Sequence, residues 1–90
     1  MERKQVISQF SGMLIDMDYI LCIPSVHAIH DNEEIVMDFG GKVRTISEGF
    51  PREKVDELRK WVLLHADEIM KNHHKCGHYD YPLDMIEPLS

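Results

Sequence analysis

The stretch from Pro51 to His73 constrains the fold of this chain most, because it is the one run long and periodic enough to define a helix. Pro51 suits the first helical position, where its missing N–H removes no helical bond. Charged residues fall on one side of the run, and an inner stripe falls on the other. The inner stripe contains Val55, Leu58, Val62, His65 and Ile69, with Trp61 and Ala66 beside it. The pattern predicts one long amphipathic helix over about residues 51–73, which needs a surface to pack on.

The residues before this helix predict a small antiparallel β-meander of three to four strands within about residues 10–46. The first strand is expected over residues 10–23, after a polar and frayed N-terminus. Gly12 is expected to mark a bulge or a close backbone approach in this strand. Residues 16–18 are a further candidate for an interruption that turns the segment into a hairpin. One face of the strand would carry Met13, Ile15, Met17, Tyr19 and Leu21.

Turn signals divide the rest of the meander. Asp31–Asn32 separates a strand expected at about 26–30 from one at 34–39. Gly40–Gly41 then suits a tight two-residue hairpin that leads into a strand at 42–46. In that last strand, alternation predicts Val43 and Thr45 on one face, and Lys42, Arg44 and Ile46 on the other.

The end of the chain predicts a packing tail over residues 77–90. Gly77 fits a turn after the helix, and the prolines that follow rule out a continued helix. The apolar residues expected to fold back on the core are Leu83, Met85, Ile86 and Leu89. Strands, then one long helix on a sheet face, then an extended tail predict a single α+β domain of 90 residues.

Composition narrows the classes of function. The formal net charge is −6 and the ten basic residues are dispersed, so nucleic-acid binding is unsupported, because it needs clustered cations. Cys22 and Cys76 do not make a disulfide framework. The apolar run at 13–26 is interrupted by Asp16 and Asp18, so neither a signal peptide nor a membrane span is expected. These features predict a cytoplasmic protein with reduced thiols.

Four pieces of sequence, taken in order, cover nearly the whole chain: VISQFSGMLIDM, PSVHAIHDNEEIVMDFGGKV, WVLLHADEIMKN and the closing IEPL. Together they resemble the small bacterial family catalogued as domain of unknown function 4160, with its Pro-His-x-His-Ala strand, Trp-x-x-x-His helix and final Ile-x-Pro-Leu. The chain departs from that pattern at Ser25, which replaces the first His of the pair, and at His73, where Trp is common. The resemblance implies a short meander with a helix, no established reaction, and an association with toxin–antitoxin-like gene pairs.

Histidines supply the candidate catalytic residues, which are His27 and His65, with Glu34 as an acid. The alternative for His27 is a half-buried sheet residue whose side chain leaves the strand on the face opposite His30. His65 lies four residues after Trp61, so the two rings are expected to stack. The alternative for His65 is a core-edge histidine that donates a hydrogen bond to the sheet or the tail.

Two further groups are candidates for binding. His74, Cys76 and His78 offer imidazole and thiolate ligands for a zinc-like transition metal, and the alternative is a solvated helix end. Leu64 projects onto the charged side of the helix, where with Trp61 it predicts an interface with a protein partner or a second copy.

The small size, the acidic charge and the absence of a catalytic constellation favour a non-catalytic protein-interaction module. The family resemblance implies that this module is one half of a regulatory or toxin–antitoxin-like pair. Its partner would be another protein or a second copy, with no membrane and no cofactor involved. The alternative is a small ribonuclease-type or metal-binding protein that uses its histidines.

Overall fold

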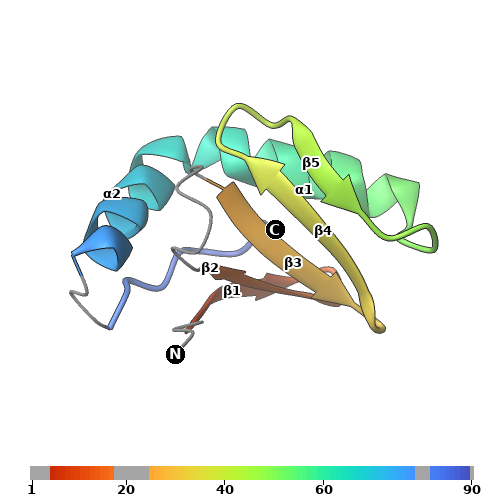
Figure 1. The fold of residues 1–90 in the computed structure, drawn as a ribbon, viewed down its shortest axis with the longest axis horizontal. Coiled ribbons are helices and arrows are strands. Elements are labelled where there is room, and N and C mark those ends of the chain that lie inside the picture. Colours follow the sequence, from red (N-terminus) through yellow and green to blue (C-terminus); the bar gives the residue numbers. More distant parts are fainter. Residues whose placement is uncertain (1–4, 18–24, 79–81, 90) are drawn as a thin grey trace.

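A computed structural model describes residues 5–17, 25–78 and 82–89, apart from the side chain of Cys76 (Figure 1). Its elements are β1 (Gln5–Phe10), β2 (Met13–Met17), β3 (Ser25–His30), β4 (Glu33–Asp38), β5 (Val43–Ile46), α1 (Arg52–Leu64) and α2 (Ala66–Gly77). The five strands form one antiparallel sheet in chain order, and α1 and α2 pack on one of its faces. The α+β meander with a helical layer on one face is therefore confirmed. The described residues form five strands and two helices, whereas three to four strands and one long helix were expected.

The first strand differs from the prediction. Residues 5–10 form β1, and a turn with positive φ at Ser11 (53°) and Gly12 (76°) leads into β2. A bulge in β1 buries both Ile7 and Ser8, although neighbouring residues of a regular strand face opposite sides. Because of this bulge, the apolar and polar residues of β1 do not alternate regularly, and the sequence pattern did not predict the strand. Met13, Ile15 and Met17 are buried as expected, whereas Tyr19 and Leu21 lie outside the described residues.

The predicted single helix is two helices that meet at His65. The backbone of His65 leaves the helical region, with φ −110° and ψ 26°. Its N–H still donates to the Trp61 carbonyl, and its own carbonyl accepts from the Ile69 N–H, so the chain bends there and continues. α2 then extends to Gly77, beyond the expected end at 73. No proline or glycine marks the bend, so periodicity alone does not locate it.

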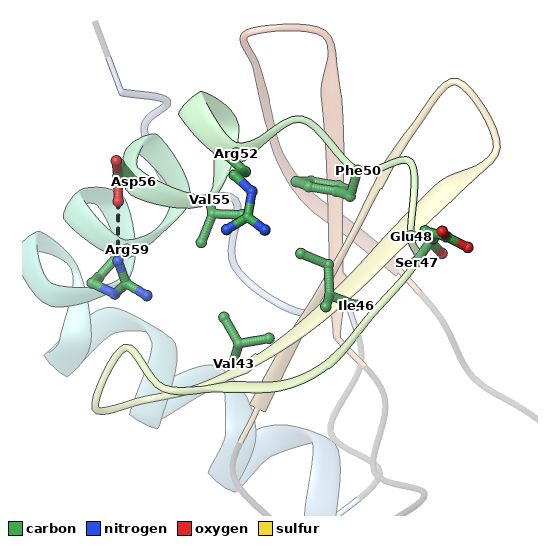
Figure 2. A pocket seen from close by; sticks show the side chains of 9 residues that line it. All are labelled: Val43, Ile46, Ser47, Glu48, Phe50, Arg52, Val55, Asp56 and Arg59. Atoms are coloured by element: carbon green, nitrogen blue, oxygen red, sulfur yellow. Dashed lines mark hydrogen bonds and ion pairs between the residues drawn. The ribbon is translucent and has the colours of Figure 1, made fainter.

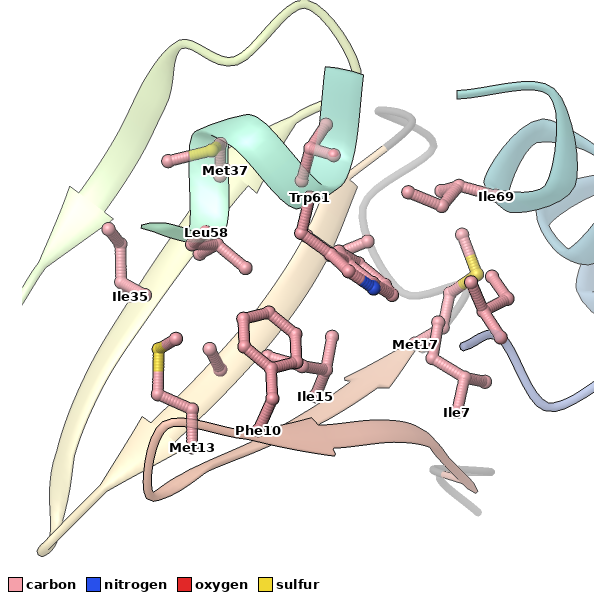
Figure 3. Close-up of a cluster of buried hydrophobic side chains, with 14 of the residues drawn as sticks. Ile7, Phe10, Met13, Ile15, Met17, Ile35, Met37, Leu58, Trp61 and Ile69 are labelled. Atoms are coloured by element: carbon pink, nitrogen blue, oxygen red, sulfur yellow. The ribbon is translucent and has the colours of Figure 1, made fainter. Parts of the chain in front are cut away.

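The core lies between the sheet and the helices (Figure 3). Leu58, Val62 and Ile69 of the inner stripe are fully buried, as predicted. Trp61 is also 0% exposed, and its ring centroid lies 5.6 Å from that of Phe10 in β1. Trp61 therefore joins the helical layer to the first hairpin.

The C-terminal tail, residues 82–89, packs on the core as predicted. Three buried or half-buried side chains hold its backbone. The Gln5 amide bonds both backbone groups of Leu83, the Asn72 amide bonds both of Asp84, and Trp61 Nε1 donates to the Glu87 carbonyl. The Ile86 N–H also donates to the Ile7 carbonyl of β1. Leu83 and Ile86 are buried, but Met85 is 66% exposed, contrary to expectation. The tail thus lies against the β1 end of the sheet.

Candidate functional site

The opposite end of the sheet is formed by β5, which has no further strand beside it among the described residues. β5 pairs with β4 through Met37–Val43, Val36–Thr45 and Ile35–Ile46, so Arg44 is an extra residue in the ladder. This bulge lets Val43 and Ile46 turn toward α1 together (Figure 2). The predicted placement of Val43 and Ile46 on opposite faces was therefore wrong.

Val43 and Ile46 line a groove between β5 and α1, with a volume of about 650 Å³ (Figure 2). Phe50 and Val55 complete its apolar floor, and the charged residues along it are Glu48, Arg52, Asp56 and Arg59. Arg59 and Glu48 lie at opposite ends of the groove in Figure 2. We call this the β5–α1 groove. Sequence reasoning missed it because the bulge at Arg44 carries no glycine or proline signal.

Local hydrogen bonds fix both ends of the β5–α1 groove. At one end, Arg59 Nε donates to the Gly41 carbonyl over 2.9 Å, and Gly41 has φ +86°. A Cβ on Gly41 would lie 2.9 Å from Arg59 Cγ, so glycine permits this approach of α1 to the β4–β5 turn. At the other end, the Phe50 N–H donates to the Ser47 carbonyl, a turn that places the Phe50 ring in the core.

The backbone of β5 is also accessible at Ile46. The Ser47 N–H donates to the Glu34 carbonyl and so faces β4. Because N–H groups alternate in direction along a strand, the N–H and C=O of Ile46 face away from β4. The Ile46 side chain is 46% exposed. This position therefore presents a free strand edge and an apolar side chain together.

A second site lies on the open face of the sheet, which is the face opposite the helices. His27 in β3 lies between Asp16 in β2 and Glu34 in β4. Its Nδ1 is 2.9 Å from Asp16 Oδ1, and its Nε2 is 2.6 Å from Glu34 Oε1. The pKa of His27 is raised, chiefly by the hydrogen bond to Asp16 and also by Glu34, against the lowering effect of burial. The His27 ring thus ties three strands together.

The structure brings two of the three catalytic candidates together. His27 contacts Glu34, whereas His65 lies in the helical layer, where its Nδ1 is 2.7 Å from Glu68 Oε1. The rings of His65 and Trp61 are neighbours as predicted, with centroids 5.8 Å apart, but their planes are tilted by 50° rather than stacked. Among the described residues, His65 bonds to Glu68 of its own helical layer rather than to the sheet or the tail. Asp16 was missed as a partner of His27, although an acid within an apolar strand is a signal for a buried ion pair.

The candidate metal ligands lie at the end of α2. The rings of His74 and His78 are 4.3 Å apart between centroids, and His78 Nδ1 donates to the His74 carbonyl over 2.9 Å. The side chain of Cys76 lies outside the described residues, and no metal-binding group of three appears among the residues that are described. The metal site stays a prediction. Nearby, burial lowers the pKa of His73, whose ring meets Phe39 edge-on.

The two predicted interface residues, Trp61 and Leu64, differ in their exposure to solvent. Trp61 is fully buried, so it is not available to a partner, and its predicted interface role was wrong. Leu64 is 70% exposed at the end of α1, beside Leu63 at 55%. An interface at Leu64 stays a prediction.

Comparison with known proteins identifies the family. Residues 22–74, more than half of the chain, match the family model described as Domain of unknown function (DUF4160). The chain belongs to this family. The DUF4160 match runs from the residues before β3 into α2, so it includes His27, Glu34 and the β5–α1 groove. No curated protein and no solved structure matches the chain. In the part of this DUF4160 protein that the structure describes, no helix is long and apolar enough to cross a membrane.

Proposed function

We propose that this DUF4160 protein is a non-catalytic protein-interaction module that binds another protein chain along the open edge of β5. The observation that carries the proposal is the β5–α1 groove, because it joins an open strand edge to an apolar floor. An extended segment added to a sheet edge gains affinity from backbone hydrogen bonds and specificity from side-chain pockets. Ile46 offers both, through its outward-facing amide and its exposed side chain.

The geometry of His27 supports the non-catalytic part of the proposal. A general base needs a ring nitrogen within reach of the proton that it removes. Both nitrogens of His27 are engaged by carboxylates, and His65 lies in the other layer of the fold. A ribonuclease-type enzyme would also favour a basic surface, whereas this chain has a formal charge of −6. The ion-paired His27 is therefore assigned to the sheet rather than to a reaction.

We further propose that this protein is one half of a toxin–antitoxin-like pair in the cytoplasm. The support for this part is the association implied by the family resemblance, together with the small size and the acidic charge. An acidic module attracts a basic partner and speeds its association.

Light scattering coupled to size-exclusion chromatography tests the proposal, on the protein alone and mixed with the product of the adjacent gene. We expect a complex in at least one case, and we expect Ile46→Asp to abolish it by placing a charge in the β5–α1 groove. Leu14→Asp is the matched control, because Leu14 is exposed to a similar degree as Ile46 (41% against 46%) and lies outside the groove. A protein that stays monomeric and unbound, or that binds equally well with Asp at position 46, contradicts the proposal.

A further inference from the structure

The occupant of the β5 edge can be inferred from the charges along this strand. We infer that it is a second copy of this chain, which pairs β5 with β5 in antiparallel fashion about a two-fold axis. The inference rests on the proposed function and names the partner at the same surface. It would join the two five-stranded sheets into one continuous sheet.

The two ends of β5 carry opposite charge. Lys42 directly precedes β5, Arg44 is its second residue, and Glu48 follows its end. Glu33 adds to the acidic end, because a Cβ on Gly49 would lie 2.7 Å from Glu33 Oε1. The side chains of Lys42, Arg44 and Glu48 have no hydrogen-bond or ion-pair partner among the residues that the structure places. These charges are therefore available to another chain.

The acids near the basic end are already engaged within the chain. Asp38 Oδ1 accepts the backbone N–H groups of Gly40 and Lys42, each over 2.9 Å. Asp56 lies 3.1 Å from Arg59 Nη1. Neither acid pairs with the side chains of Lys42 or Arg44, so the start of β5 keeps its positive charge.

Antiparallel self-pairing makes this polarity complementary. The N–H and C=O of Ile46 face outward, so a two-fold axis at Ile46 lets the two copies exchange backbone hydrogen bonds there. The basic start of each β5, which holds Arg44, then lies beside the acidic end of the other copy, where Glu48 follows the strand, and this arrangement occurs twice. An unrelated segment would pair equally well only if it also ran from basic to acidic residues. A second copy of β5 always has this order of charges.

The same pairing covers the exposed apolar surface. A two-fold axis perpendicular to the sheet places both helical layers on one side, so the β5–α1 grooves of the two copies face each other. Val43 and Ile46 of each copy then line one shared apolar seam, which removes Ile46 from water. Pairing also removes the open edge, which otherwise favours uncontrolled association.

Sedimentation velocity over a protein concentration range of ~1 to ~500 µM tests the inference by charge reversal. We expect the wild type to shift from monomer toward dimer, and we expect Arg44→Glu and Glu48→Arg each to weaken dimerisation by about tenfold or more. An equimolar mixture of these two variants should recover dimerisation, because each mixed dimer has two attractive pairs. The matched control, Lys60→Glu, reverses an exposed charge on α1 outside the groove and should dimerise like the wild type.

The outcomes separate this inference from the proposed function. A monomer at all concentrations that still binds the adjacent gene product in an Ile46-dependent way overturns the self-pairing and leaves the interaction role standing. A dimer that is insensitive to both reversals, or that does not recover in the mixture, also overturns the self-pairing. A monomer that binds neither itself nor that product overturns both.

Discussion

Replacement of Asn72 by Ala tests how the tail is held. Asn72 is 0% exposed, and its amide makes two hydrogen bonds of 2.8 and 2.9 Å with the backbone of Asp84. A buried polar group left without a partner costs about 1–3 kcal/mol. The backbone groups of Asp84 lie on an exposed residue and can regain water, so the lower part of that range applies to each. We therefore expect Asn72→Ala to lower the free energy of unfolding by about 2–3 kcal/mol.

Urea denaturation followed by the fluorescence of Trp61, the only tryptophan, measures this loss. Trp61 is a suitable probe because its Nε1 donates to the Glu87 carbonyl in the same tail. The expected loss corresponds to a decrease in melting temperature of roughly 10 °C or more for a domain of this size. Detachment of the tail before global unfolding would also reduce the slope of the denaturation curve.

Lys75→Ala is the matched control. Lys75 Nζ lies 3.4 Å from Asp84 Oδ1, so it touches the same tail residue through an exposed ion pair. Exposed pairs contribute about 0–1 kcal/mol, and we expect a loss near the bottom of that range. If Asn72→Ala costs no more than Lys75→Ala, then the buried amide does not hold the tail and the reasoning is refuted.

Two further predictions concern the sheet. His27→Gln should lower the free energy of unfolding by about 1–3 kcal/mol near pH 6, because it removes charged hydrogen bonds to Asp16 and Glu34. Since the folded-state pKa of His27 is raised above its ordinary 6.5, this stabilisation is complete below pH 6.5 and is lost as pH rises through the folded-state pKa. Unfolding titrations at several pH values check this, and a difference that grows toward pH 9 would contradict it. Ser8→Ala should raise the free energy of unfolding by about 0.5–1 kcal/mol, because the buried Ser8 hydroxyl has no partner in the described structure; thermal denaturation measures this, and a lower melting temperature would count against it.

The parts of the fold that sequence predicts are those set by local periodicity. The inner stripe of Leu58, Val62 and Ile69 follows from helical spacing. A turn at Gly40–Gly41 was also predicted, but its tight two-residue form was wrong, because residues 39–42 separate β4 from β5. The bulges in β1 and β5 break the two-residue period without a marker residue, so β1 and the β5–α1 groove were missed. The bend at His65 likewise has no proline or glycine that marks it in the sequence.

The candidate site shows the same division. His27 and Glu34 lie on either side of one short turn in the sequence, so their proximity can be predicted. The pairing of β3 with β4 and the contact between the two side chains confirm it. Asp16 joins them only through the register between β2 and β3, which local pattern does not specify. The Arg44 bulge that opens the β5–α1 groove is also a property of register. Residues that depend on register between strands are therefore the ones that sequence reasoning failed to place.

The central claim is that the open edge of β5 is a binding surface, and amide hydrogen exchange at Ile46 tests it most directly. The account predicts that the Ile46 amide exchanges quickly in the dilute, unbound protein, because it faces away from β4. It predicts that this amide becomes protected when protein concentration is raised or the adjacent gene product is added, while the Ser47 amide, bonded to the Glu34 carbonyl, is protected throughout. If complexes form and Ile46 exchanges as quickly as before, then β5 is not the binding edge.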